Sequence, residues 1–275
     1  MTNLFSYGFM QNAILTGVMA SIICGVIGPF IVARRMVFIS GGLSHTAFGG
    51  LGIAYWLGVN PLYGASLFVL SAALIIGWWE EKISRHDMFI GILWAFGVAV
   101  GIIFIHLTPG YVPDLMTFLF GNILTVSQTD LHITFFLVFI VTLPVFIFFK
   151  GMISVTFDEE YAKARKLPVK TLNIMLLALF ALSIVTLIQV VGIILVIALI
   201  TIPVAVSGEF SSSFKGIMAL STLFGALFCL SGLFLSYFFE LPSGAAIILI
   251  GTFTLILTKA IKYLFQRNSN VYRHS

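Results

Sequence analysis

The chain has 275 residues, of which 60% are hydrophobic and only 9% charged, and its mean hydropathy is +1.13. Soluble domains carry about 25% charged residues, so this composition excludes a soluble protein and predicts an all-α polytopic membrane protein. The net charge of +4 comes from basic residues scattered between apolar runs, which argues against a nucleic-acid surface. We treat residues 1–275 as a single domain.

Apolar runs in the chain are long enough to cross a hydrocarbon core of about 30 Å as helices. The first eleven residues contain no lysine or arginine, so we expect the first run to be a retained span and not a signal peptide. The interval 112–128 is interrupted by proline, glycine and polar residues, and it is predicted to form a short or re-entrant helix against protein. The nine expected spans lie near residues 10–33, 41–58, 62–79, 88–107, 131–149, 171–189, 191–207, 216–238 and 244–264.

The basic residues orient these spans. With nine spans, all 14 lysines and arginines fall on one side of the membrane, which the positive-inside rule identifies as the cytoplasm. The N-terminus is then outside, and the tail 259–275 is cytoplasmic. A model with eight spans would either merge the pair near 171–207 or lose the first span. Merging would put some basic residues outside, so nine spans are preferred.

The second span carries a histidine among small residues. Gly41, His45, Gly49 and Gly52 share one helical stripe, and small residues at this spacing let another helix approach closely. An ionisable side chain inside a membrane is a candidate functional group, and a neutral imidazole binds zinc and other transition metals. Ser44 adds a weak oxygen donor. The alternative is a histidine that only hydrogen-bonds a neighbouring helix.

Other ionisable residues lie at the ends of spans. His106, Asp114, Asp130, His132 and Glu240 are expected to have interfacial or hydrogen-bonding roles, because polar side chains are tolerated best there. The chain has no G-x-x-x-x-G-K-[ST] motif, so it has no phosphate-binding loop of that type. Any step driven by ATP would need a partner protein.

The longest cytoplasmic loop contains a charged segment at 156–168. Thr156 and Glu159 have the spacing of a capping box, acidic residues fill the first turn, basic residues fill the last, and Pro168 ends the helix. The pattern predicts a short amphipathic helix that either docks a soluble partner or is a solvated connector. A later span, at 190–205, contains Pro203 near its cytoplasmic end, where a proline permits a bend.

Together, these stretches resemble the integral-membrane permease subunit of bacterial and archaeal ABC importers for zinc, manganese and related metals. The resemblance covers roughly residues 10–265. It is carried by Arg34-Arg35-Met36, Leu43-Ser44-His45, Phe157-Asp158-Glu159-Glu160, Ala162, Ala164-Arg165, Leu167-Pro168-Val169, Val191-Gly192, Leu195-Val196, Ala198-Leu199 and Pro203.

The resemblance implies a transport subunit of the cell membrane that is not itself an enzyme and holds no cofactor of its own. It implies a homodimer, an extracytoplasmic metal-binding protein that delivers the ion, and two cytoplasmic ATPases that bind ATP and dock on the loop helix. The residues expected to couple to the ATPase are Asp158, Glu159, Glu160, Ala162, Arg165, Leu167 and Pro168.

The resemblance also implies that His45 and Ser44 lie on the metal pathway. Family members have an aspartate four residues before this histidine, and the matching position here is Gly41. Since manganese prefers oxygen ligands, the missing carboxylate favours zinc over manganese, with iron possible. Lys166 replaces a glycine of the family's loop helix. The alternatives are a permease for a metal chelate or another small solute, and a stand-alone secondary transporter.

Overall fold

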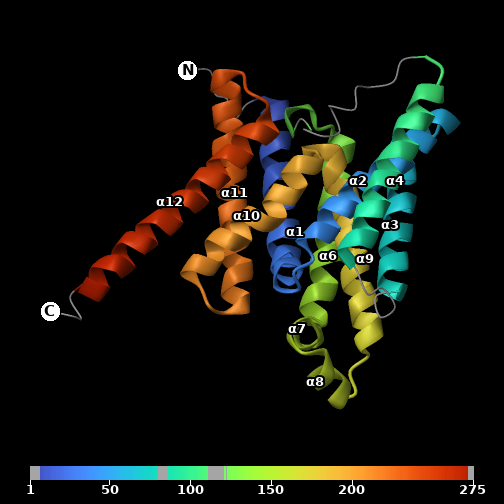
Figure 1. Ribbon diagram of the computed structural model, residues 1–275. Coiled ribbons are helices and arrows are strands. Elements are labelled where there is room, and N and C mark those ends of the chain that lie inside the picture. The colour runs from blue at the N-terminus through green and yellow to red at the C-terminus, as the bar shows by residue number, and fades with distance from the viewer. Residues whose placement is uncertain (1–6, 80–85, 111–120, 122, 272–275) are drawn as a thin grey trace.

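The structure is a computed structural model that describes residues 7–79, 86–110, 121 and 123–271. It is helical, as expected (Figure 1). The helices are α1 (Gly8–Ala33), α2 (Val37–Leu57), α3 (Pro61–Trp79), α4 (His86–Leu107), η2 (Ile123–Thr125), α6 (Gln128–Ile147), α7 (Phe149–Phe157), α8 (Glu159–Ala164), α9 (Val169–Val191), α10 (Ile193–Phe210), α11 (Phe214–Phe239) and α12 (Ser243–Val271).

Among the described residues, nine helices are long and apolar enough to cross a membrane, which confirms the expected number of spans. The eight-span alternative fails at Gly192, the single residue between α9 and α10. Its φ of +82° and ψ of +160° interrupt the helix, and glycine adopts this conformation without steric cost. Two separate spans therefore replace the merged one.

Close backbone contacts hold α2 between α3 and α4. A Cβ atom at Gly50 would overlap the carbonyl of Gly64 in α3, and one at Gly52 would overlap the carbonyl of Gly101 in α4. Small residues permit such approaches, and they gain van der Waals contact that lipid tails would not supply. The glycine-rich stripe of α2 is therefore a helix-packing surface, as its spacing indicated.

The second half of the core forms around α1, which packs against α6, α10 and α11. The side chains of Ile27 and Phe30 are completely buried there, and the Phe30 ring meets the Phe214 ring edge-on with centroids 4.7 Å apart. A tight turn joins α1 to α2. It therefore connects the group of helices packed around α1 to the group packed around α2.

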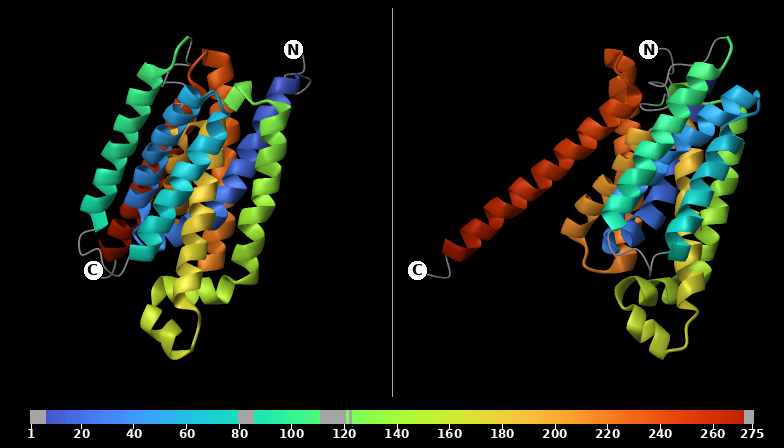
Figure 2. Two further views of the ribbon diagram at one scale, coloured as in Figure 1. Left: turned by 90° about the vertical axis from the view of Figure 1, so that its right-hand side faces the viewer. Right: turned by 45° about the vertical axis from the view of Figure 1, so that its right-hand side comes forward.

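The described turns that carry basic residues lie at one end of the bundle, where α7 and α8 project beyond the spans (Figures 1 and 2). The start of α1 and the end of α12 lie toward opposite ends of the bundle, as an odd number of spans requires (Figure 1). Helix α12 leans away from the other helices (Figure 2), and the ammonium of Lys262 lies 2.7 Å from Glu209 Oε2 at the end of α10. Lys82 and Arg85 lie outside the described residues.

Most of the proposed re-entrant segment at 112–128, including Asp114, lies outside the described residues. Its described part contains the short 3-10 helix η2, in which the Ile123 side chain is 1% exposed. A Cβ atom at Gly121 would overlap the backbone of Val191. This part of the segment packs against protein, as expected.

Candidate functional site

His45 lies in the first half of α2, on the side that faces α4. Its ring stacks on the indole of Trp94, with centroids 4.2 Å apart and planes at 10°, and the Phe48 ring lies 6.2 Å away on α2. The indole also covers Gly41, where a Cβ atom would lie 3.3 Å from Trp94 Cζ3. The space beside His45 on the previous turn is therefore occupied by an aromatic ring.

Ser44 and His45 do not converge on one point. Ser44 is completely buried, and its hydroxyl has no hydrogen-bond partner among the described residues, whereas His45 is only half-buried. Adjacent residues on a helix project in different directions, so a shared ion between these two side chains is not favoured. The described structure contains no cluster of three or more histidine, cysteine, aspartate or glutamate side chains that could hold a metal.

Trp94 was missed by the sequence analysis. A tryptophan in an apolar span carries no local signal for a site, and its contact with His45 depends on how α2 and α4 pack. Two of the polar residues near span ends have the expected hydrogen-bonding roles. Asp130 and Ser127 form the capping box of α6, and His132 Nδ1 lies 2.6 Å from the Gln128 carbonyl oxygen.

The charged loop folds differently from the expected capping box. Thr156 lies inside α7, and its hydroxyl donates to the Met152 carbonyl at 2.7 Å. The N-cap of α8 is instead Asp158, whose side chain accepts a hydrogen bond from the Tyr161 amide at 2.9 Å. The prediction was wrong because α6 continues almost directly into α7, which uses residues assigned to the loop helix. Helix α8 has 6 residues.

The expected coupling residues occupy two faces of α8 and its flanks. Ala162 is completely buried and Leu167 half-buried, so these side chains hold α8 against the rest of the protein. Glu159 also points inward, toward Arg34 and Asn173. Four of the residues expected to couple are exposed, namely Asp158, Glu160, Arg165 and Pro168.

The turn after α8 contains a lysine in a left-handed conformation. Lys166 has a φ of +58°, and the Leu167 amide donates to the Ala162 carbonyl at 3.0 Å, as in a Schellman motif. We expect Lys166→Gly to stabilise this turn by about 1 kcal/mol, because glycine avoids the strain of a Cβ atom at positive φ. Hydrogen exchange of the α8 amides should slow about fivefold.

The matched control for that variant is Lys163→Gly. Lys163 lies in the last turn of α8 and precedes the left-handed residue, so glycine there should destabilise α8 by up to about 1 kcal/mol. Opposite shifts in amide exchange are therefore expected for the same chemical change. A faster exchange in both variants would contradict this interpretation of Lys166.

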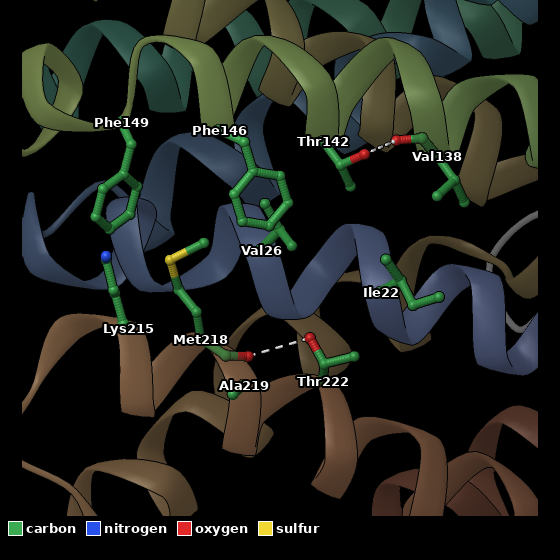
Figure 3. A pocket seen from close by; sticks show the side chains of 10 residues that line it. All are labelled: Ile22, Val26, Val138, Thr142, Phe146, Phe149, Lys215, Met218, Ala219 and Thr222. Atoms are coloured by element: carbon green, nitrogen blue, oxygen red, sulfur yellow. Dashed lines mark hydrogen bonds between the residues drawn. The ribbon is translucent and has the colours of Figure 1, made fainter.

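A cavity of about 570 Å³ lies away from His45, between α1, α6 and α11 (Figure 3). Most of its lining is apolar. The hydroxyls of Thr142 and Thr222 donate to carbonyls of their own helices, and the Lys215 ammonium lies 5.3 Å from the centroid of the Phe149 ring. Since its one ionisable side chain is a cation, this cavity does not suit a metal ion.

The chain is similar to known membrane proteins over most of its length. A family model described as the ABC 3 transport family matches residues 6–262. The chain is 43% identical to an uncharacterised membrane protein of Synechocystis over 95% of its length and 94% of the relative's. It is 38% identical to the manganese transport system membrane protein MntC of Listeria innocua, covering 90% of this chain and 89% of MntC.

A solved structure has the same fold. The chain superposes on a chain of PsaBC from Streptococcus pneumoniae, solved in complex with Fab, with a TM-score of 0.83 and 35% sequence identity. The match covers 93% of this chain and 92% of the other. With the family model covering nearly the whole sequence, the chain belongs to the ABC 3 transport family, as a multi-pass membrane permease subunit of a metal-ion ABC importer.

Proposed function

We propose that this permease carries a divalent transition metal ion inward across the cytoplasmic membrane, past His45. The position of His45 carries the proposal. A rise of 1.5 Å per residue puts it about 12 Å along α2 from Val37, inside a hydrocarbon core of about 30 Å. Exposing an ionisable imidazole to lipid at that depth costs free energy. The exposed side of the half-buried His45 ring is therefore expected to face a polar path.

Manganese is the first candidate for the ion. Relatives that match about nine tenths of this chain are named as manganese transport proteins, including MntC of Listeria innocua and of Halalkalibacterium halodurans. Zinc is the second candidate, because the described structure offers His45 as an imidazole ligand with Gly41 in place of a carboxylate. The preference for zinc expected from the sequence stays a prediction.

Two surfaces indicate the partners, namely the half-buried side of His45 on α2 and the exposed face of α8. We propose a homodimer with a shared path. In such a dimer, a second copy of this chain facing the half-buried side of His45 would supply a second imidazole. The exposed face of α8, with Asp158, Glu160 and Arg165, is proposed to dock a cytoplasmic ATPase. An extracytoplasmic metal-binding protein would deliver the ion to the opposite side. This assignment places the N-terminus outside and the 259–275 tail inside.

Competition in uptake tests the choice of cargo. Proteoliposomes with this permease, its ATPase and its binding protein should take up radioactive manganese, and excess unlabelled zinc should compete. An excess of a metal-free chelator should lower uptake by removing free ions. Uptake that occurs only with a preformed metal chelate would instead support the alternative permease for chelates and would refute passage of the bare ion.

A further inference from the structure

Three partly buried polar side chains join α8 to the membrane-spanning helices. Arg34 Nη1 donates to Asn173 Oδ1 at 2.9 Å, and Arg34 Nη2 lies 3.1 Å from Glu159 Oε1. Asn173 Nδ2 donates to the same Glu159 oxygen at 2.9 Å. Arg34 is the C-cap of α1, Glu159 lies in the first turn of α8, and Asn173 lies in the second turn of α9. We call them the Arg34–Glu159–Asn173 triad.

The triad is shielded from solvent on the side of α1. The Arg34 side chain is only 9% exposed, and Asn173 is 8% exposed, whereas the Glu159 side chain is 41% exposed. Hydrogen bonds between charged groups are shorter and stronger than neutral ones. Removing one partner of a buried ion pair costs more than removing one at the surface, so the contact between Arg34 and Glu159 resists separation.

One end of the triad is fixed to the turn that starts α2. Arg34 is the C-cap residue of α1, Arg35 follows in a left-handed conformation with a φ of +57°, and the Met36 amide donates to the Ile31 carbonyl at 2.9 Å. Such a closed turn has few free torsions. Arg34 is therefore joined to the start of α2, the helix that carries His45, through a short hydrogen-bonded turn.

The other end of the triad lies under the surface proposed to dock the ATPase. Glu159 faces inward, while its neighbour Glu160 is exposed and pairs with Lys163 on α8, with the ammonium 3.0 Å from Glu160 Oε1. The Glu160 side chain is 85% exposed. The adjacent carboxylates of α8 thus have different surroundings. Glu159 contacts side chains of α9 and of the end of α1, whereas Glu160 is exposed.

We propose that the Arg34–Glu159–Asn173 triad transmits movement of α8 to the α1–α2 turn and so to His45. The inference rests on the proposed function, since it assumes that an ATPase moves α8. Arg34, Glu159 and Asn173 are positioning residues, because they act through α2 and do not touch the ion. Breaking the triad should separate ATP hydrolysis from transport.

The test measures metal uptake per ATP hydrolysed by the complete reconstituted complex. For Arg34→Ala and Glu159→Ala we expect this ratio to fall about tenfold, within the usual range of coupling between sites, while ATP hydrolysis continues. The double variant should fall no further than either single variant, because both remove the same contact. Glu159→Gln, which keeps an oxygen acceptor, should lose less. Glu209→Ala is the matched control and should keep the native ratio, because Glu209 pairs with Lys262, at 2.7 Å, and belongs neither to the triad nor to the proposed docking face.

Three outcomes would overturn the proposal. The first is a native uptake ratio in Arg34→Ala and Glu159→Ala. The second is equal losses in Glu159→Ala and Glu209→Ala. The third is loss of the ATPase from the purified Glu159→Ala and Glu159→Gln complexes, since the triad would then support docking and not transmission. If the native complex itself moves no metal, the proposed function fails, and this result is distinguishable because it appears before any variant is compared.

Discussion

Replacing His45 by phenylalanine is expected to reduce manganese uptake at least about tenfold while the complex still assembles. Groups that only orient a metal ligand change affinity or activity about 10- to 100-fold, so a ligand itself should matter no less. Phenylalanine keeps an aromatic ring against Trp94 but has no nitrogen for the ion. Uptake of radioactive manganese by proteoliposomes, at matched permease levels, measures the effect.

Two further variants separate metal binding by His45 from packing. His45→Ala removes both the nitrogen and the stack on Trp94, so it should lower uptake at least as much as His45→Phe. His106→Ala is the control, because His106 is an exposed histidine in the last turn of α4. If His45→Phe transports like the native chain and only His45→Ala fails, His45 is a packing residue and the ion takes another path.

Replacing Gly50 by valine is expected to prevent formation of the native helix bundle. The new side chain would meet the backbone of Gly64 and Ala65, which cannot rotate away as a side chain could. Overpacking typically costs about 1–3 kcal/mol, and we expect the upper end or more because α3 itself must shift. The yield of monodisperse permease and its midpoint of thermal unfolding in detergent report the loss.

Gly91→Val is the matched control for Gly50→Val. Gly91 also lies inside a membrane-spanning helix, but a Cβ atom there has no neighbour within 4 Å. The same substitution should therefore leave yield and unfolding temperature close to native. Equal losses in the two variants would mean that valine disturbs these helices locally, and the close contact between α2 and α3 would not explain the effect.

The sequence predicts the spans well because each depends on local composition. A run of about 20 apolar residues must form a helix in lipid, where every backbone polar group needs an internal partner. The separation of α9 from α10 followed from the placement of basic residues even though Gly192 alone divides them. The start of α2 was placed four residues late, since Val37 and its neighbours give no distinct capping signal.

The site was less predictable because its contacts are long-range. His45 was found from its position in a span, but its contact with Trp94 depends on the packing of two helices separated in the chain. The sequence indicates an orienting charge and a family motif at Arg34, but not its pairing with Glu159 in the structure. Thr156 failed as a cap because a short-range pattern does not reveal that α7 continues through it. Local sequence patterns therefore predict the helices, whereas the side-chain contacts between helices depend on tertiary packing.

The most direct test of the account is whether metal accumulation requires ATP hydrolysis by a partner. Proteoliposomes containing this permease, its ATPase and its binding protein should accumulate radioactive manganese when ATP is supplied on the side of α8. A complex with a hydrolysis-deficient ATPase should not accumulate it. Equal accumulation by the permease alone, driven by a proton or sodium gradient, would contradict the account and would identify a secondary transporter.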